Sequence, residues 1–143
     1  MIRPLIAEDT ARMAAIHKAS FPSGWPAEEM QTHLDKDLCL GIGIPLSAFI
    51  LVQTSPDQGD ILTLACAPDA RRQGYGRALL QAAEKALIEK KIATLFLDVS
   101  EINEAAIALY KSCDYQPIGR RPAYYRTATG RVAAITFSKS LLA

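Results

Sequence analysis

The chain has 143 residues, of which 50% are hydrophobic, and its formal net charge is +1 at pH 7. This length is typical of one domain, and burial of about 70% of the unfolded surface would stabilise it without a metal or a disulfide. The longest apolar run, 44–52, is interrupted by Pro45 and Ser47 and is too short to span a bilayer. We therefore expect one globular domain over residues 1–143, with no membrane segment.

The first sixty residues contain short elements separated by clear breaks. We predict a strand at 2–5 and then a helix that begins near Glu8 and Asp9 and has an apolar stripe up to Ala19. Two prolines and a glycine make 22–26 a loop, which a second helix follows. That helix is expected over 27–35, strands over 38–44 and 46–54, and a turn over 55–60.

The rest of the chain alternates strands with helices. The pattern predicts a strand at 61–67, a helix after the segment PDARRQGYG, a strand at 93–99, a helix at 103–111, and final strands at 115–119 and 132–137. The last two strands would flank a basic loop that contains the turn signal TATG. This order predicts an α/β (α+β) fold, in which a mixed sheet of about seven strands has helices on both faces.

Cysteine usage and the N-terminal segment indicate a compartment. Cys39, Cys66 and Cys113 are odd in number and lack a CxxC spacing, which favours reducing conditions. The segment MIRPLIAEDT has acids by its second turn and no apolar stretch, so we expect no secretory signal. These features predict a cytoplasmic protein. His17 and His33 have no metal-ligand spacing, and we expect no metal.

Charge is distributed unevenly along the chain. The residues from 115 to the end include no acid but five bases, which are Arg120, Arg121, Arg126, Arg131 and Lys139. They could form a solvated rim, or a surface that meets a phosphate-bearing ligand or an RNA-associated partner. No aromatic-interleaved nucleic-acid motif accompanies them, which argues against direct nucleic-acid binding.

One glycine-rich segment lies between a predicted strand and a predicted helix. It consists of Arg71, Arg72, Gln73, Gly74, Tyr75 and Gly76. Glycines expose backbone N–H groups, a helix N-terminus adds partial positive charge, and arginines add bidentate donors, all of which suit a pyrophosphate. The third glycine of GxGxxG and the GK[ST] ending of a P-loop are both missing. The alternative is a glycine-rich turn that only begins a helix.

These motifs resemble those of a known family. R-x-x-G-x-G after a strand is similar to the Q/R-x-x-G-x-G/A signature of GNAT acetyltransferases, which binds the pyrophosphate of acetyl-CoA. LFLDVSEINEAAIALYKSCDY (95–115), FPSGWPAEEM (21–30) and RRPAYYRTATGR (120–131) resemble segments of the bacterial ribosomal-protein N-terminal alanine acetyltransferases. The resemblance covers nearly the whole chain. It implies an enzyme that moves an acetyl group from acetyl-CoA to an amine, such as the N-terminal α-amine of a ribosomal protein.

The resemblance also implies where the cosubstrate binds. In the family, acetyl-CoA enters between two parallel strands, and backbone N–H groups of the first strand hold it; here these belong to Leu64, Ala65 and Cys66. A nucleophilic role for Cys66 would need a nearby histidine, so we expect a small buried strand residue. Asn103 would contact the pantetheine arm, although its pattern also suits a helix N-cap.

Two side chains are candidates for proton transfer. Asp98 lies among apolar strand residues, where a carboxylate is costly unless it is used or paired. The family has a glutamate there as proton acceptor, so the shorter Asp98 would act through a water; the alternative is a residue that caps a turn. Tyr110 follows Ile107 at helical spacing, as core aromatics do. The resemblance assigns its hydroxyl to protonation of the CoA thiolate, which is compatible with packing of its ring.

Three departures from the family pattern concern the acceptor more than the chemistry. Asp98 replaces the glutamate, Cys113-Asp114-Tyr115 replaces L-G-F, and Val132-Ala133 replaces a Glu-Asp pair. Asp114 can still adopt the left-handed backbone that the glycine would take. The alternatives are a small-amine acetyltransferase (for a polyamine, amino acid or drug) with a closed, acid-lined pocket, and a non-catalytic acyl-CoA-binding module. An RNA-directed acetyltransferase is a more remote one.

Overall fold

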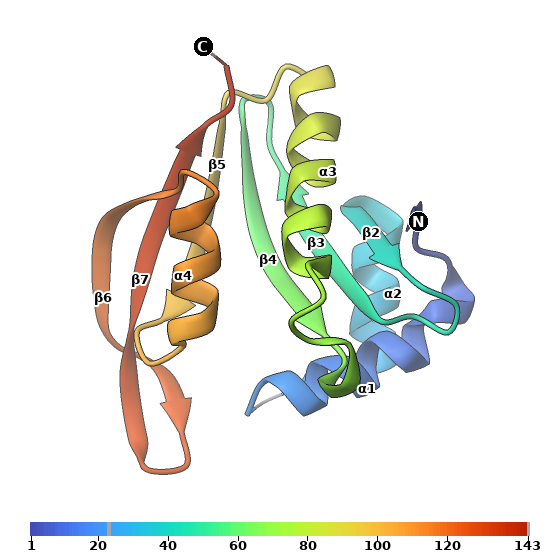
Figure 1. Cartoon of the computed structure of the whole chain (residues 1–143), viewed down its shortest axis with the longest axis horizontal. Coiled ribbons are helices and arrows are strands. Elements are labelled where there is room, and N and C mark those ends of the chain that lie inside the picture. The colour runs from blue at the N-terminus through green and yellow to red at the C-terminus, as the bar shows by residue number, and fades with distance from the viewer. Residues whose placement is uncertain (23, 143) are drawn as a thin grey trace.

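The computed structural model describes residues 1–22 and 24–142, and in this part of the chain seven strands form one sheet in the order β1-β2-β3-β4-β5-β7-β6 (Figure 1). The strands are β1 (Ile2–Pro4), β2 (Leu38–Ile42), β3 (Ala48–Thr54), β4 (Gln58–Cys66), β5 (Thr94–Ser100), β6 (Gln116–Thr127) and β7 (Gly130–Ser140). The helices are α1 (Thr10–Ser20), α2 (Ala27–Lys36), α3 (Tyr75–Glu89) and α4 (Glu104–Ser112), with 3-10 turns η1 (Ala7–Asp9) and η2 (Pro68–Ala70). Only β4 and β5 pair in parallel, so the predicted mixed sheet is confirmed.

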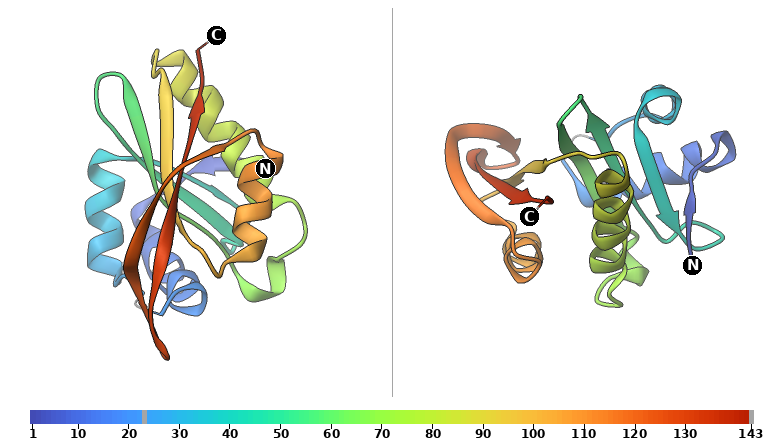
Figure 2. Two further views of the ribbon diagram at one scale, coloured as in Figure 1. Left: turned by 90° about the vertical axis from the view of Figure 1, so that its left-hand side faces the viewer. Right: turned by 90° about the horizontal axis from the view of Figure 1, so that it is seen from above.

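Helices cover both faces of the sheet, as the element order predicts (Figure 2). On one face α3 contributes fully buried Leu79, Leu80 and Leu87 to a large apolar cluster. On the other face α1 and α2 contribute Met13, Ile16 and Met30 to a second cluster. None of the described helices is long and apolar enough to cross a membrane.

A bulge in β4 changes the direction of its side chains. Leu51 of β3 lies opposite Thr63 and Val52 lies opposite Ile61, so Leu62 is an extra residue. Before the bulge Ile61 packs on the α3 face, whereas after it Ala65 packs on the α1 and α2 face. β4 pairs with β5 only from Gln58–Thr94 to Ile61–Leu97. Beyond Ile61 the two strands separate, as Figure 1 shows.

A polar cluster joins the two halves of the sheet near the end where β4 and β5 are paired. The Tyr115 hydroxyl donates to Glu84 Oε2 of α3 at 2.7 Å, and Lys139 Nζ of β7 lies 3.1 Å from Glu84 Oε1. Burial, reinforced by the Glu84 carboxylate, raises the pKa of Tyr115, so its hydroxyl keeps its proton and donates. Both carboxylate oxygens of Glu84 therefore have a partner, and a charge can be buried in a protein only when it is paired in this way.

The largest differences from the predicted boundaries are in the strands. β4 begins at Gln58, so the predicted turn at 55–60 is shorter, and residues 43–46 form a turn rather than strand. The predicted basic loop is strand: β6 and β7 form a long hairpin whose arms extend to Thr127 and Gly130. β6 accommodates Pro117 and Pro122 because it is an edge strand with two register shifts, where missing N–H donors are tolerated.

His17 holds the connection between α1 and α2 in place. It is 4% exposed and stacks on Trp25 with ring centroids 4.5 Å apart. The Trp25 backbone N–H donates to His17 Nδ1 at 3.1 Å, so Nδ1 carries no proton and the ring is neutral. Burial lowers the pKa of His17 to about 4.

We predict that the folded protein loses stability as the pH is lowered, because of His17. The unfolded chain takes up a proton near pH 6.5 but the folded chain only near 4, so the free energy of unfolding should drop across this window by up to about 3 kcal/mol. Urea unfolding at several pH values, followed by the fluorescence of the single tryptophan, measures this. In His17→Gln the drop should be smaller by that amount, and an unchanged drop would contradict the assignment.

Candidate active site

The glycine-rich segment forms the N-terminus of α3, as predicted. Gly74 is the N-cap, with φ of 81°, and no side chain caps the helix. The first N–H groups of α3 therefore have no intrahelical partner. A Cβ added at Gly74 would have no atom within 4 Å, so the surface beside the N-cap is open. This open set of donors fits a phosphate group.

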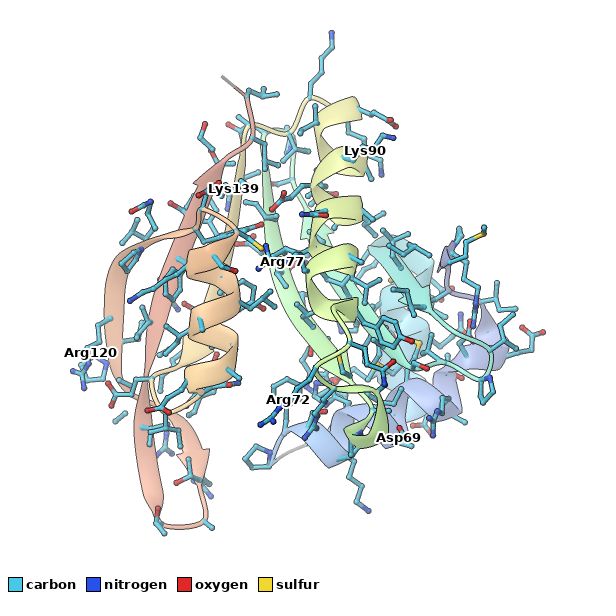
Figure 3. The ribbon with its side chains drawn as sticks, viewed as in Figure 1. Asp69, Arg72, Arg77, Lys90, Arg120 and Lys139 are labelled. Atoms are coloured by element: carbon cyan, nitrogen blue, oxygen red, sulfur yellow. The ribbon has the colours of Figure 1, made fainter. Side chains whose placement is uncertain are left out.

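Side chains around these donors add positive charge. Arg71 Nε contacts the Cys66 carbonyl at 3.4 Å, and its Nη2 contacts Ser20 Oγ at 3.3 Å, so Arg71 spans the end of β4 and α1. Arg72 is exposed in the same loop and points toward the space between β4 and α4 (Figure 3). Gln73 donates to the Asp69 carbonyl at 3.4 Å, which closes the loop.

β4 presents backbone donors along the edge from which β5 has separated. The Ala67 N–H donates to the Ser47 carbonyl on the β3 side at 2.8 Å. Alternation along the strand directs the Ala65 N–H to β3 as well, and those of Leu64 and Cys66 toward the gap. Of the three residues that the resemblance singles out, Leu64 and Cys66 are thus placed to hold a ligand, and their role stays a prediction.

Tyr110 lies across the gap from Cys66. Its ring packs edge-on against Tyr115, with centroids 5.7 Å apart, and its side chain is 6% exposed. Burial raises the pKa of Tyr110, and Tyr125, Cys113 and Cys66 add to the rise, which places its hydroxyl near residues of β4 and β6. Burial also raises the pKa of the Cys66 thiol, although Arg71 opposes this. A protonated, half-buried thiol suits the predicted small strand residue.

Asp98 lies on the opposite face of the sheet, in a pocket of about 640 Å³. Thr136 Oγ1 donates to Asp98 Oδ1 at 2.6 Å, and Arg121 Nε lies 3.8 Å from the same oxygen. Burial and the nearby Asp98 carboxylate raise the pKa of Tyr125 to about 12. The pocket runs between the α1–α2 connection and the β6–β7 hairpin; its lining includes Trp25, Gln53, Gln58, Asp60, Leu62, Phe96, Ile118, Arg121, Tyr124, Tyr125 and Thr136.

Asn103 caps α4, since its Oδ1 accepts the Ala106 N–H at 3.1 Å. This bears out the N-cap interpretation, whereas contact with a cosubstrate stays a prediction. Asp114 has φ of 70°, which confirms the left-handed backbone expected of it.

Several contacts at the site have no signal in the sequence. Thr136 and Arg121 are far from Asp98 in sequence, and only the pairing of β7 with β5 brings Thr136 beside it. Arg77 reaches from α3 to Ser112 Oγ of α4 at 2.7 Å and so fixes the spacing of the two helices (Figure 3). Within the described residues no group of three or more His, Cys, Asp and Glu side chains could hold a metal ion.

Comparison with known proteins identifies the class. Residues 10–115 match the acetyltransferase (GNAT) family, and the chain belongs to that family. It is 41% identical over 90 residues to ribosomal protein bS18-alanine N-acetyltransferase of Escherichia coli K12, covering 63% of this chain and 61% of that protein. The match thus spans less than two thirds of that relative. A putative enzyme of the same description from Bacillus subtilis 168 is 29% identical over 139 residues, which is 94% of this chain and 91% of the relative.

Solved structures agree. The crystal structure of the ribosomal-protein-S18-alanine N-acetyltransferase from E. coli matches with a TM-score of 0.89 and 28% identity, over 100% of this chain and 94% of that chain. Ard1 from Thermoplasma volcanium shares the fold, with a TM-score of 0.89 and 22% identity over 100% and 98% of the two chains. The GNAT resemblance and fold predicted from the sequence are confirmed.

We predict that Gly74→Glu weakens CoA binding at least about tenfold, because a carboxylate would stand among donors suited to a pyrophosphate. The space around Gly74 is open, so the fold should survive. Gly74→Gln imposes the same backbone strain without the charge and should bind more tightly than Gly74→Glu. Calorimetric titration with CoA compares the three proteins, and equal affinities would show that the glycine-rich segment at the N-terminus of α3 does not bind CoA.

Proposed function

We propose that the protein transfers the acetyl group of acetyl-CoA to the N-terminal α-amine of a protein, such as a ribosomal protein, by direct attack of the amine. The observation that supports this is the separation of β4 from β5 beyond Ile61 and Leu97. It leaves a gap in the sheet. Backbone N–H groups that suit a phosphate lie on the α3 side of this gap, and the Asp98 pocket lies on the other side. Two reactants could therefore meet through the sheet, and proximity of this kind supplies much of the rate enhancement.

The cosubstrate would supply an activated thioester, and the residues of this chain would bind and orient it. The N-terminus of α3 with Arg71, Arg72 and Gly74 would hold the pyrophosphate. The N–H groups of Leu64 and Cys66 would hold the pantetheine arm and the carbonyl, where they stabilise developing negative charge. Asn103 lies at the N-terminus of α4, and we propose that it contacts the same arm.

Asp98 and Tyr110 would divide the proton transfers. Asp98, oriented by Thr136, would accept a proton from the attacking amine, directly or through a water. The Tyr110 hydroxyl, whose raised pKa keeps it protonated, would donate to the sulfur as negative charge develops there. The two groups approach the gap from opposite faces, as an amine and a leaving thiolate require.

The shape of the pocket bears on the acceptor. It is lined on one side by Trp25 and on the other by Tyr124 and Tyr125, which suits an extended peptide terminus. A small amine is the second candidate, because Asp60 and Asp98 both line the pocket.

A peptide library incubated with acetyl-CoA and analysed for acetylated N-termini tests the acceptor assignment. Acetylation of free amines but of no peptide would favour the second candidate. We further propose that residues 1–143 act as one domain in the cytoplasm.

We expect Tyr110→Phe to lower turnover by about 100-fold or more at similar Michaelis constants, because only the hydroxyl is lost. Tyr115→Phe is the matched control: it removes a neighbouring buried hydroxyl that binds Glu84, so stability should fall while turnover persists. Thiol release and urea unfolding of both variants provide the comparison. Wild-type turnover in Tyr110→Phe would leave Tyr110 as a packing residue only.

Asp98 is tested by two substitutions. Asp98→Asn should lower the rate at neutral pH and abolish the acid limb of the pH–rate profile, because the amide keeps a hydrogen bond but takes no proton. Asp98→Glu should be at least as active as the wild type, since the longer side chain reaches further toward the gap. If all three proteins reacted at one rate, the amine would be arriving deprotonated and Asp98 would have no role as base.

A further inference from the structure

Asp60 is a second carboxylate in the acceptor pocket, and its charge has no partner there. Its contact is with Gln58 Nε2, at 3.4 Å from Oδ2, which is a long hydrogen bond. No cationic group lies within 4 Å of it among the described residues. A carboxylate has about four acceptor positions, so most of the capacity of Asp60 is available to a ligand.

Asp98 differs from Asp60 in this respect. It accepts the Thr136 hydroxyl and has Arg121 at 3.8 Å, so its charge has partners within the protein. The three charged groups that line the pocket are Asp60, Asp98 and Arg121, and their sum is one negative charge. That remaining charge lies at the Asp60 end.

The register of the strands places Asp60 relative to the reacting centre. Asp60 is directly opposite Gln53 on β3 and Phe96 on β5, and Asp98 is two residues beyond Phe96. Neighbouring strands lie about 4.8 Å apart and each residue advances about 3.3 Å, so residues one strand across and two residues along are about 8 Å apart. Gln53 and Gln58, which also line the pocket, make this end polar, whereas Ile61, Leu62 and Leu97 make the wall between apolar.

We propose that Asp60, together with Gln53 and Gln58, is a specificity subsite that binds a second positively charged group of the acceptor, at a carboxylate about 8 Å from Asp98. In a protein acceptor this group is the side chain of a basic residue at position 1 or 2. The inference rests on the proposed function, since it takes the Asp98 pocket as the acceptor site. It adds a requirement that transfer chemistry alone does not impose.

Paired peptides test this subsite. Arginine and citrulline have nearly the same shape, but only arginine is charged and neither side chain is an acetylation target. With arginine at position 1 or 2, the wild-type protein should show kcat/KM about three- to tenfold higher than with citrulline, mainly through KM. The preference should shrink as ionic strength rises, because the subsite is half-exposed.

Variants separate a specific subsite from general charge attraction. In Asp60→Asn the arginine-to-citrulline ratio should fall to near one, and Asp60→Glu should restore it in part. Asp57→Asn removes the same charge from the exposed β3–β4 turn, outside the pocket, and should keep the full ratio. Equal ratios in wild type and Asp60→Asn, or no preference in the wild type, would overturn the subsite.

A second set of acceptors distinguishes failure of the subsite from failure of the protein-acceptor assignment. If no peptide is acetylated, butane-1,4-diamine and butylamine are compared by thiol release. A diamine preference that Asp60→Asn abolishes would support the subsite while rejecting the protein acceptor. If the wild type acetylates neither peptides nor amines, both proposals are wrong.

Discussion

The single extra residue in β4 is the constraint on which the site depends. Leu62 has no partner on β3, and this is where β4 stops pairing with β5. Two consequences follow from the same bulge: the side chains change faces, and the backbone groups of Leu64 and Cys66 lose the neighbour that would have bonded them. A regular parallel sheet would have filled this edge with hydrogen bonds and left no opening through the layer.

An opening of this kind needs support at both ends. At the paired end, Glu84 connects α3 to Tyr115 and Lys139, which belong to the other half of the sheet. At the open end, Arg77 bonds Ser112 across α3 and α4. Gly76 allows these helices to approach, because a Cβ there would lie 3.2 Å from Leu109 Cδ2. The gap is thus held by side-chain contacts between elements that share few backbone hydrogen bonds.

Local pattern was enough to predict most of this fold. The helices and the glycine-rich N-terminus of α3 follow from periodicity and from glycine and arginine placement, and each lies within a few residues of its predicted position. The prediction makes the β6–β7 hairpin too short, because the basic residues on either side of TATG are typical of a loop and only the pairing of the two strands shows that they continue as a hairpin. Thr136, Arg121 and Asp60 were missed because their significance comes from strand register. No local signal in the sequence reports which residues stand opposite Asp98 or Phe96.

In the proposed mechanism, the distribution of charge would let Asp98 act on protons while its neighbour Asp60 binds a cation. Asp98 is oriented by a short hydrogen bond and faces Arg121, so an incoming ammonium gains less there than at an unpartnered carboxylate. Asp60 offers that carboxylate at the far end of the same pocket. If the cationic group of the acceptor binds at Asp60, it does not bind at Asp98, which stays close to the reacting amine. The register of β4 and β5 puts the two carboxylates on adjacent strands, two residues apart, and this offset would separate the proposed recognition from the proposed proton transfer.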